Sequence, residues 1–214
     1  MGLCYAVEMP GRMFLTSDLA RIATHLDAVS AFSEAPPARR NIAPGQEVVV
    51  CDPDRRLLPM RWGIVPVGRK NARGRPVMET IINARSETVF EETAFEGVRR
   101  CLVPCDGWYE WTGKARRKTA WRISRKNGDP VVFAGIFDIW TAPGGLQVPQ
   151  VSTLTCEPSA DVRDIHHRMG VILAPDAFET WLMGSESEAQ TLCQPLQDGS
   201  LTVAEADDVD WVAP

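Results

Sequence analysis

Two polar clusters contain side chains that could act together on one ligand. In the first, residues 83–88 read Asn-Ala-Arg-Ser-Glu-Thr, with Asn83 and Arg85 two positions apart. Side chains so spaced on an extended segment point to the same side, so both could reach one pocket. In the second cluster, residues 106–111, Glu110 stands between aromatic residues. Apolar surroundings raise the pKa of a carboxyl group, which suits Glu110 to general acid–base catalysis near neutral pH.

A third cluster, His166-His167-Arg168-Met169, precedes an apolar segment that we expect to be a strand. Taken singly, each cluster has a structural interpretation, because structural polar networks contain the same residue types. Asn83 would be a turn amide, Glu110 a surface residue on a strand and His166 a capped histidine. Only their combination favours a functional site.

The cysteines are expected to be reduced thiols. Only Cys101 and Cys105 lie near each other in the sequence, and adjacent His166 and His167 suit chelation of one metal ion poorly. The first residues lack a basic leader followed by a long apolar run, which supports the reduced state. We predict mostly buried thiols, no metal and no cofactor. The six cysteines are Cys4, Cys51, Cys101, Cys105, Cys156 and Cys193.

The charges are unevenly distributed. Residues 55–126 hold 17 of the 23 Lys and Arg residues but only 7 of the 28 Asp and Glu residues, together with tryptophans at positions 62, 108, 111 and 121. Cations for phosphates and aromatic rings for bases are what a groove for single-stranded nucleic acid needs. The alternative is a solvated hairpin with tryptophans in the core. After Leu182 the chain has seven acids and no base, and we expect a solvated end.

Local patterns predict three helices. The first begins at about Ser17, whose hydroxyl can cap it, and carries an apolar stripe at Leu19, Ile22, Ala23 and Leu26. The second covers roughly residues 87–97. The third covers about residues 176–183 and ends at Gly184.

Short apolar segments separated by turn residues predict strands at 47–51, 57–65, 100–105, 107–111, 119–124, 131–140 and 167–173. Many short strands with helices near both ends favour one α+β domain over residues 1–214. We expect a curled, mostly antiparallel sheet with a barrel-like core and flanking helices. No run approaches about 18 apolar residues, so we expect no membrane span and a cytoplasmic protein.

The order of the three clusters resembles the SOS response-associated peptidase (SRAP) family. The motifs are NARSET, RCLVPCDGWYEW and IHHRM followed by VIL, with supporting matches in NIAPGQ, RWGIVP and FAGIFDIW. The resemblance covers about residues 11–182 and leaves 183–214 as an acidic C-terminal extension. It implies an α+β domain that binds single-stranded DNA and senses abasic sites, and we expect a monomer.

In that family an N-terminal cysteine condenses with the ring-opened abasic sugar. Its amine forms an imine with the C1 aldehyde, and its thiolate closes onto the imine to give a thiazolidine. An α-amine with a pKa near ~7.7 is partly neutral at cellular pH and therefore already nucleophilic.

The resemblance also assigns roles to residues of this chain. The nucleophile would be Cys4, while Asn83 and Arg85 orient the amine and a DNA phosphate, with Arg85 as a bidentate anchor. Glu110 would be the proton shuttle, and His166 would protonate the sugar oxygen as the ring opens. The implied DNA contacts are Arg12, Pro44, Arg61, Trp62, Arg85 and Trp108.

The N-terminal sequence departs from the family pattern. Members usually begin Met-Cys-Gly-Arg, or Met-Cys followed by Tyr or Asn. Residues 9–19 align with the first form, and Pro10 stands where the cysteine belongs. Alternatively, Cys4 and Tyr5 represent the second form, with Gly2 and Leu3 before them and extra residues after them.

These alignments leave three possibilities open. Loss of residues 1–3 would make Cys4 the terminus. A start at Met9 would expose Pro10, a secondary amine that can form an iminium with an aldehyde. Otherwise the protein would bind DNA without a covalent step. A different class of function, a cysteine peptidase in which His166 activates Cys4 or Cys105, is a further alternative.

Overall fold

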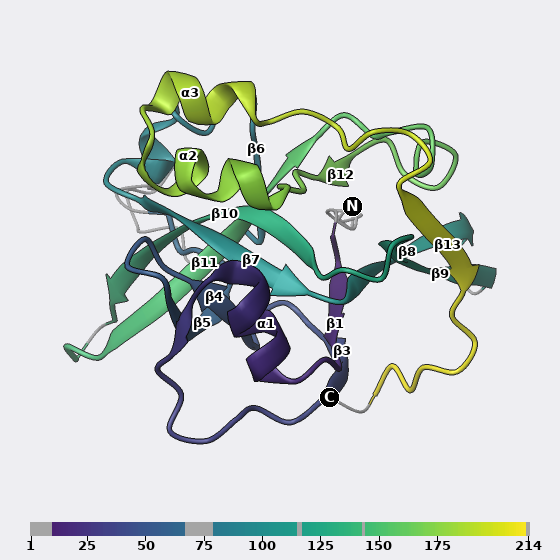
Figure 1. Ribbon diagram of the computed structural model, residues 1–214, viewed down its shortest axis with the longest axis horizontal. Helices are drawn as coiled ribbons and strands as arrows, with labels where there is room; N and C mark the ends of the chain where they lie inside the picture. The colour runs from purple at the N-terminus through teal and green to yellow at the C-terminus, as the bar shows by residue number, and fades with distance from the viewer. Residues whose placement is uncertain (1–9, 67–78, 115–116, 143, 213–214) are drawn as a thin grey trace, which may run out of the picture.

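The computed structural model describes residues 10–66, 79–114, 117–142 and 144–212. The architecture is α+β, with mostly antiparallel strands, a closed, barrel-like sheet and a few helices (Figure 1). This confirms the predicted fold class. The strands form two sheets, since each can bury its apolar face only by pairing with neighbours.

The larger sheet closes on itself. Its strand order is β12-β11-β10-β7-β4-β5-β2, and a parallel contact between β11 and β5 joins distant members of that order. A short strand, β6, also pairs with β11 in parallel. The strands are β2 (Val29–Ser30), β4 (Glu47–Cys51), β5 (Arg56–Trp62), β6 (Asn83–Arg85), β7 (Arg99–Cys105), β10 (Val131–Thr141), β11 (Gln147–Cys156) and β12 (Met169–Gly170).

The smaller sheet lies beside the barrel, at the right in Figure 1, and has the order β13-β9-β8-β1-β3. Met13, Trp108 and Ile123 lie level on β1, β8 and β9 and are buried, so this face joins the common core. Because side chains alternate along a strand, the neighbouring positions point away from the core. The strands are β1 (Arg12–Leu15), β3 (Arg39–Ile42), β8 (Gly107–Lys114), β9 (Arg117–Arg125) and β13 (Leu201–Glu205).

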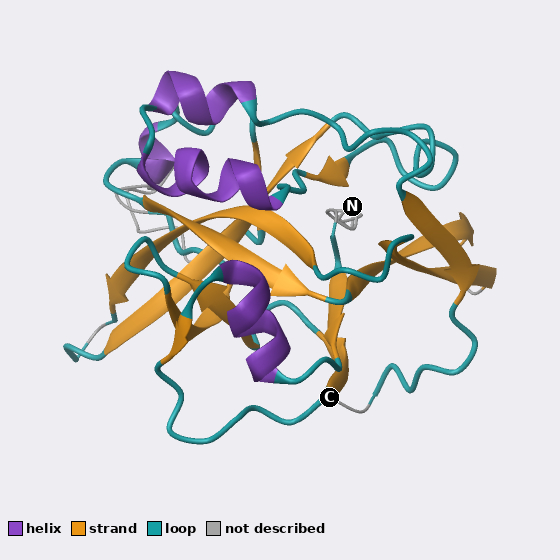
Figure 2. Ribbon diagram, in the orientation of Figure 1, coloured by secondary structure: helices purple, strands orange, loops and turns teal. Residues whose placement is uncertain are grey.

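The helices pack on the outside of the barrel, as Figure 2 shows. Helix α2 (Phe178–Met183) buries Phe178, Trp181 and Leu182, and the Trp181 indole donates a hydrogen bond to the Cys101 carbonyl at 2.9 Å. The remaining helical segments are α1 (Leu19–Leu26), α3 (Glu186–Thr191) and the 3₁₀ turns η1 (Thr93–Phe95) and η2 (Pro175–Ala177).

Two helix predictions need correction. Helix α1 is capped by Asp18, which accepts from the Arg21 amide, whereas the Ser17 hydroxyl donates to Asp106 at 2.6 Å. The helix predicted at 87–97 is wrong: only turns and η1 occur there. Val89 and Phe95 are both buried, and six residues of regular helix would place them about 120° apart around the helix axis, so they would not share one face.

The acidic end of the chain is folded against the rest of the domain and is not a free solvated end, although all seven of its acidic residues are exposed. It forms α3 and β13, and the segment after β13 buries Ala206 and Val209 against the smaller sheet. The strand predicted at 167–173 is reduced to β12 and a bridge from Ile172 to Phe133. The ten-residue strand β11 was not predicted.

Candidate functional site

Asn83 connects β6 to the residues that lead into β1. Strand β6 pairs with β11, so that Asn83 lies level with Thr153. The Thr153 hydroxyl donates to Asn83 Oδ1, and Asn83 Nδ2 donates to the Pro10 carbonyl at 3.1 Å. These two contacts hold the amide in one orientation. They also bring the buried residue Pro10 against the larger sheet.

Glu110 lies close to the same stretch of chain. Arg12 pairs with Tyr109 across β1 and β8, so the next position places Gly11 level with Glu110. The Glu110 side chain is 1% exposed, and its Oε1 has no hydrogen-bond partner among the described residues. Burial raises the pKa of this carboxyl well above its ordinary value. A buried carboxyl with a raised pKa beside Gly11 is of the kind that can donate and take back a proton, and the role of Glu110 as proton shuttle stays a prediction.

Arg85 lies two residues beyond Asn83 on β6, level with Thr155. Its side chain is exposed and forms no hydrogen bond or ion pair with the described part of the chain. As predicted, the segment is extended and Ala84 between the two is buried, so Asn83 and Arg85 share a side. The guanidinium is therefore available to an anionic ligand near Asn83.

His166 belongs to the loop before β12. Its Nδ1 accepts a hydrogen bond from the Arg168 amide at 3.1 Å, and its ring stacks on His167 with centroids 4.4 Å apart. An accepting Nδ1 puts the proton of the neutral imidazole on Nε2. Arg168 ties this loop to the β6 region, because its guanidinium binds both Glu87 carboxylate oxygens, at 2.5 and 2.8 Å.

The predicted DNA contacts have different environments. Pro44 is exposed, the half-buried Arg61 donates to the Gly63 carbonyl at 2.9 Å, and the half-buried Arg12 donates to Asn41. Trp62 and Trp108 are 0% exposed. Neither indole has an accessible face on which a base could stack. These two tryptophans are therefore core residues, which was the alternative interpretation of the aromatic residues in this region.

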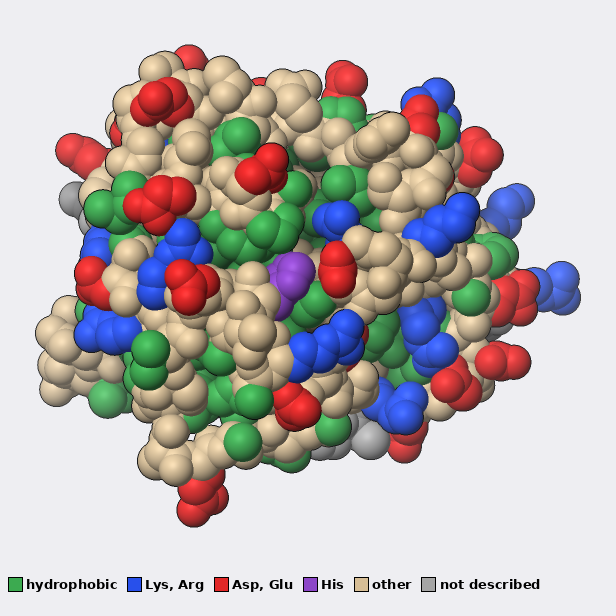
Figure 3. All heavy atoms as spheres, viewed as in Figure 1, with side chains coloured by type: hydrophobic (Ala, Val, Ile, Leu, Met, Phe, Trp, Pro, Cys, Tyr) green, Lys and Arg blue, Asp and Glu red, His purple; other side chains and the backbone are tan. Residues whose placement is uncertain are grey.

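The cations of the smaller sheet do not form a uniform patch. On the face shown in Figure 3, Lys and Arg side chains gather at the right, over this sheet, with Asp and Glu side chains among them. Arg122 of β9, for example, pairs with Asp208 at 2.5 Å. A DNA backbone on this face would therefore meet separate cations rather than a continuous basic surface.

A half-exposed aromatic cluster on the outer face of the smaller sheet was missed. Trp211, after β13, packs edge-on against Tyr109 and Trp111, with centroids 4.9 and 5.1 Å apart. Together with the Asp208–Arg122 pair, it fastens the end of the chain to β8 and β9. The sequence feature that could have predicted this cluster is Trp211, since a tryptophan within an acidic segment is rarely left solvated.

Cys4, the predicted nucleophile, lies outside the described residues. The five other cysteines are free and buried. Burial raises the pKa of Cys51 to about 11 and that of Cys156 to about 12, and it raises the pKa of Cys105 further. Buried protonated thiols are poor nucleophiles, so the structure gives no support to Cys105 as a peptidase nucleophile.

The described part of the chain contains no group of three His, Cys, Asp or Glu residues that could hold a metal ion. None of its helices is long and apolar enough to cross a membrane.

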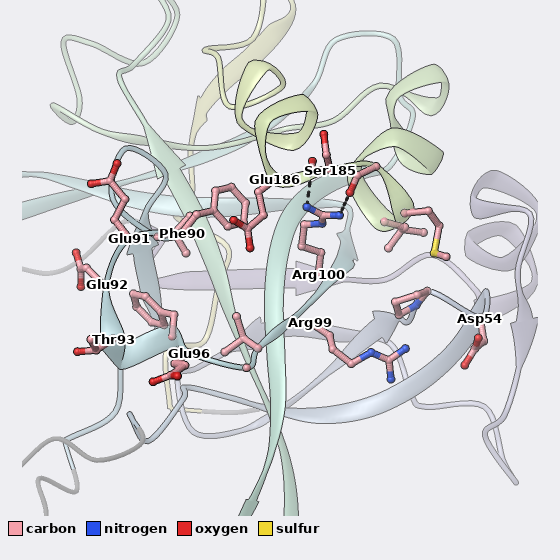
Figure 4. A pocket seen from close by; sticks show the side chains of 18 residues that line it. Asp54, Phe90, Glu91, Glu92, Thr93, Glu96, Arg99, Arg100, Ser185 and Glu186 are labelled. Carbon is pink, nitrogen blue, oxygen red and sulfur yellow. Dashed lines mark hydrogen bonds between the residues drawn. The ribbon is translucent and has the colours of Figure 1, made fainter.

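A cavity of about 880 Å³ lies between η1, the start of β7 and the end of α2 (Figure 4). Its lining includes Asp54, Glu91, Glu92, Glu96 and Glu186, while Arg100 is occupied by the carbonyls of Gly184 and Ser185. None of the predicted site residues lines it. An acidic lining repels phosphate, so this cavity does not fit a DNA backbone.

Comparisons with known proteins agree with the sequence motifs. The abasic site processing protein YoaM of Bacillus subtilis is 35% identical over 149 residues, which are 66% of this chain and 64% of YoaM. The abasic site processing protein HMCES of Mus musculus is 31% identical over 179 residues, 68% of this chain and 51% of HMCES. The chain thus spans only part of the length of these relatives.

The fold is also that of solved structures. A crystal structure of a protein from Bacteroides thetaiotaomicron has a TM-score of 0.80 at 21% identity and covers 92% of both chains. One from Bordetella bronchiseptica has a TM-score of 0.77 at 24% identity, covering 92% of this chain and 99% of that one. The sequence model of the SOS response associated peptidase family matches residues 9–209. The chain therefore belongs to the SOS response associated peptidase (SRAP) family.

Proposed function

We propose that the protein processes abasic sites in DNA by binding the lesion in a single strand and capturing its aldehyde covalently. The relatives named as abasic site processing proteins support the class of lesion. The observation that carries the proposal is the Asn83–Pro10 hydrogen bond. It holds Pro10 beside Asn83 on the strand that carries Arg85, and the next residue, Gly11, lies level with Glu110. A proton donor and a phosphate anchor therefore lie near Pro10, and we infer that an amine N-terminal to Pro10 serves the same ligand.

The covalent step uses Cys4 after loss of residues 1–3. The freed α-amine attacks the C1 aldehyde of the ring-opened sugar, and the carbinolamine loses one water to give an imine. The Cys4 thiolate then adds to the imine carbon and the nitrogen takes up a proton, closing a thiazolidine. Both steps need proton transfer at the sugar oxygen and at nitrogen, which we assign to His166 and Glu110.

The test is the intact mass of the protein before and after incubation with a single-stranded oligonucleotide carrying one abasic site. We expect a species beginning at Cys4 that gains the mass of the DNA less one water and survives without borohydride. A tetrahydrofuran analogue of the abasic site, which lacks an aldehyde, should add nothing. Cys4→Ala keeps the amine but loses the thiol, so its adduct should require borohydride.

Other masses would identify the alternatives. An adduct on a species beginning at Pro10 would assign the step to that secondary amine. A chain that retains Met1 or Gly2 and gains no mass, yet binds the oligonucleotide, would be a non-covalent single-stranded DNA-binding module. A chain that neither binds nor reacts would contradict the proposal.

Arg85 is expected to contribute one phosphate contact. Replacement by Ala should weaken single-stranded DNA binding and reduce the slope of log K against log salt by about 0.7. Arg99→Ala makes the same change of charge at an exposed β7 cation, which lies 5.3 Å from the Phe137 ring, and should leave the slope unchanged. Fluorescence anisotropy between 50 and 200 mM salt, about the range in which such slopes are resolved, measures both. Equal slopes would remove Arg85 from the interface.

A further inference from the structure

Trp121 is the one tryptophan that lies level with Glu110. It is half-buried on β9 and pairs directly with Glu110 of β8. Directly opposed residues of antiparallel strands share a face, with Cβ atoms about 5 Å apart. An aromatic ring of partial exposure therefore stands beside the buried carboxyl of the candidate site.

None of the other six tryptophans is both partly exposed and beside Glu110 on the same face. Trp62, Trp108 and Trp181 are 0% exposed. Trp111 and Trp211 pack against each other on the opposite face of the smaller sheet. Trp140 is level with Val148, five residues along β11 from Thr153, which corresponds to about 17 Å of strand.

The Trp121 ring is also held in place and set among cations. Its indole N–H donates to the Thr112 hydroxyl at 2.8 Å, which fixes the ring relative to β8. Arg117 and Arg125 lie four residues before and after it on the same face of β9. Glu205 of β13 is level with Trp121 on its other side and would repel a phosphate there. These surroundings favour the ring of a base over Trp121, with phosphates near the cations.

We propose that Trp121 is a positioning residue on which the base next to the abasic sugar stacks, so that the sugar is held at Glu110. The inference rests on the proposed function and adds to it the group that fixes the flanking nucleotide. A rigid aromatic platform favours an unpaired base with little dependence on its identity. The missing base of the lesion leaves the neighbouring base without its usual stacking partner, so this base is free to pack on the protein.

The experiment uses an abasic-site oligonucleotide with 2-aminopurine on the 5′ or the 3′ side of the lesion. Stacking on Trp121 should quench the fluorescence of one of these two probes on binding. Trp121→Ala should abolish that quenching and weaken binding about tenfold, the usual size of one base–aromatic stack. Trp121→Phe should restore both, whereas Trp121→Leu, which keeps apolar volume without a ring, should not.

Trp111→Ala is the matched control, because it removes a half-buried tryptophan from the opposite face of the same β8–β9 pair. This variant should quench the 2-aminopurine fluorescence and bind the oligonucleotide as the unaltered protein does. Quenching that persists in Trp121→Ala, or full rescue by Leu, would overturn the inference while leaving abasic-site capture intact. If the unaltered protein bound no abasic oligonucleotide, the proposed function would fail together with the inference.

Discussion

Replacement of Glu110 by Gln is expected to slow covalent capture of an abasic oligonucleotide at least about 100-fold, the usual contribution of a positioned acid–base group. Gln has the shape of a protonated carboxyl but cannot exchange a proton. The affinity of the variant for single-stranded DNA should therefore stay within about twofold of that of the unaltered protein. Single-turnover adduct formation and fluorescence anisotropy measure the two quantities. Normal capture by Glu110→Gln would exclude this residue as the proton shuttle.

The stability of Glu110→Gln relative to that of the unaltered protein should depend on pH. The unfolded chain ionises Glu110 above its ordinary pKa of about 4.5, whereas burial keeps the folded carboxyl protonated to higher pH. The unaltered protein therefore loses folding free energy as pH rises through that window, whereas the amide of the variant does not titrate. Denaturation at several pH values should show Glu110→Gln gaining relative stability as the pH rises. A constant difference would mean that the carboxyl is not desolvated.

Asp106→Ala is expected to destabilise the fold by about 3 kcal/mol, since it leaves several donors without an acceptor. Asp106 lies between β7 and β8, and its carboxylate accepts from the amides and hydroxyls of Thr16 and Ser17 at 2.6–2.8 Å. These bonds join the end of β1 to the β7–β8 connection. Urea denaturation at neutral pH measures the loss.

Acid should diminish this effect. Burial alone would raise the pKa of Asp106, but the hydrogen bonds from Ser17 and Thr16 prevail and lower it. The carboxylate thus stabilises the fold above its unfolded pKa, and this stabilisation is lost as pH falls through the lowered folded value. Asp54→Ala is the control, because its side chain is 64% exposed in a pair with Arg56, and it should cost no more than about 0.5 kcal/mol. Equal effects of the two substitutions would show that the Asp106 network is not structural.

Local sequence was a good guide wherever a strand had an apolar pattern of its own. The strand predicted at 47–51 coincides with β4, and those at 100–105 and 131–140 match β7 and β10 to within a residue at each end. Strand β11 was missed because its buried residues include Gln150, Ser152, Thr153 and Thr155, which do not look like core residues. They are acceptable inside because neighbouring groups bind some of them, as Val65 and Asp138 bind Gln150. Such partners come from distant parts of the chain and leave no local pattern.

The sequence by itself determined the family, the mostly antiparallel α+β class and the residue types from which the site is built, because motifs and strand patterns are local properties. Tertiary structure alone decided which of these residues meet and which stay accessible. Alternation along β8 shows that Trp108 and Glu110 share a face, yet only the barrel packed beneath that face makes Trp108 a core residue. Likewise, Asn83 and Pro10 are 73 positions apart and touch only because β6 adds to β11. Burial and long-range pairing are properties of the assembled sheets, and no single segment contains them.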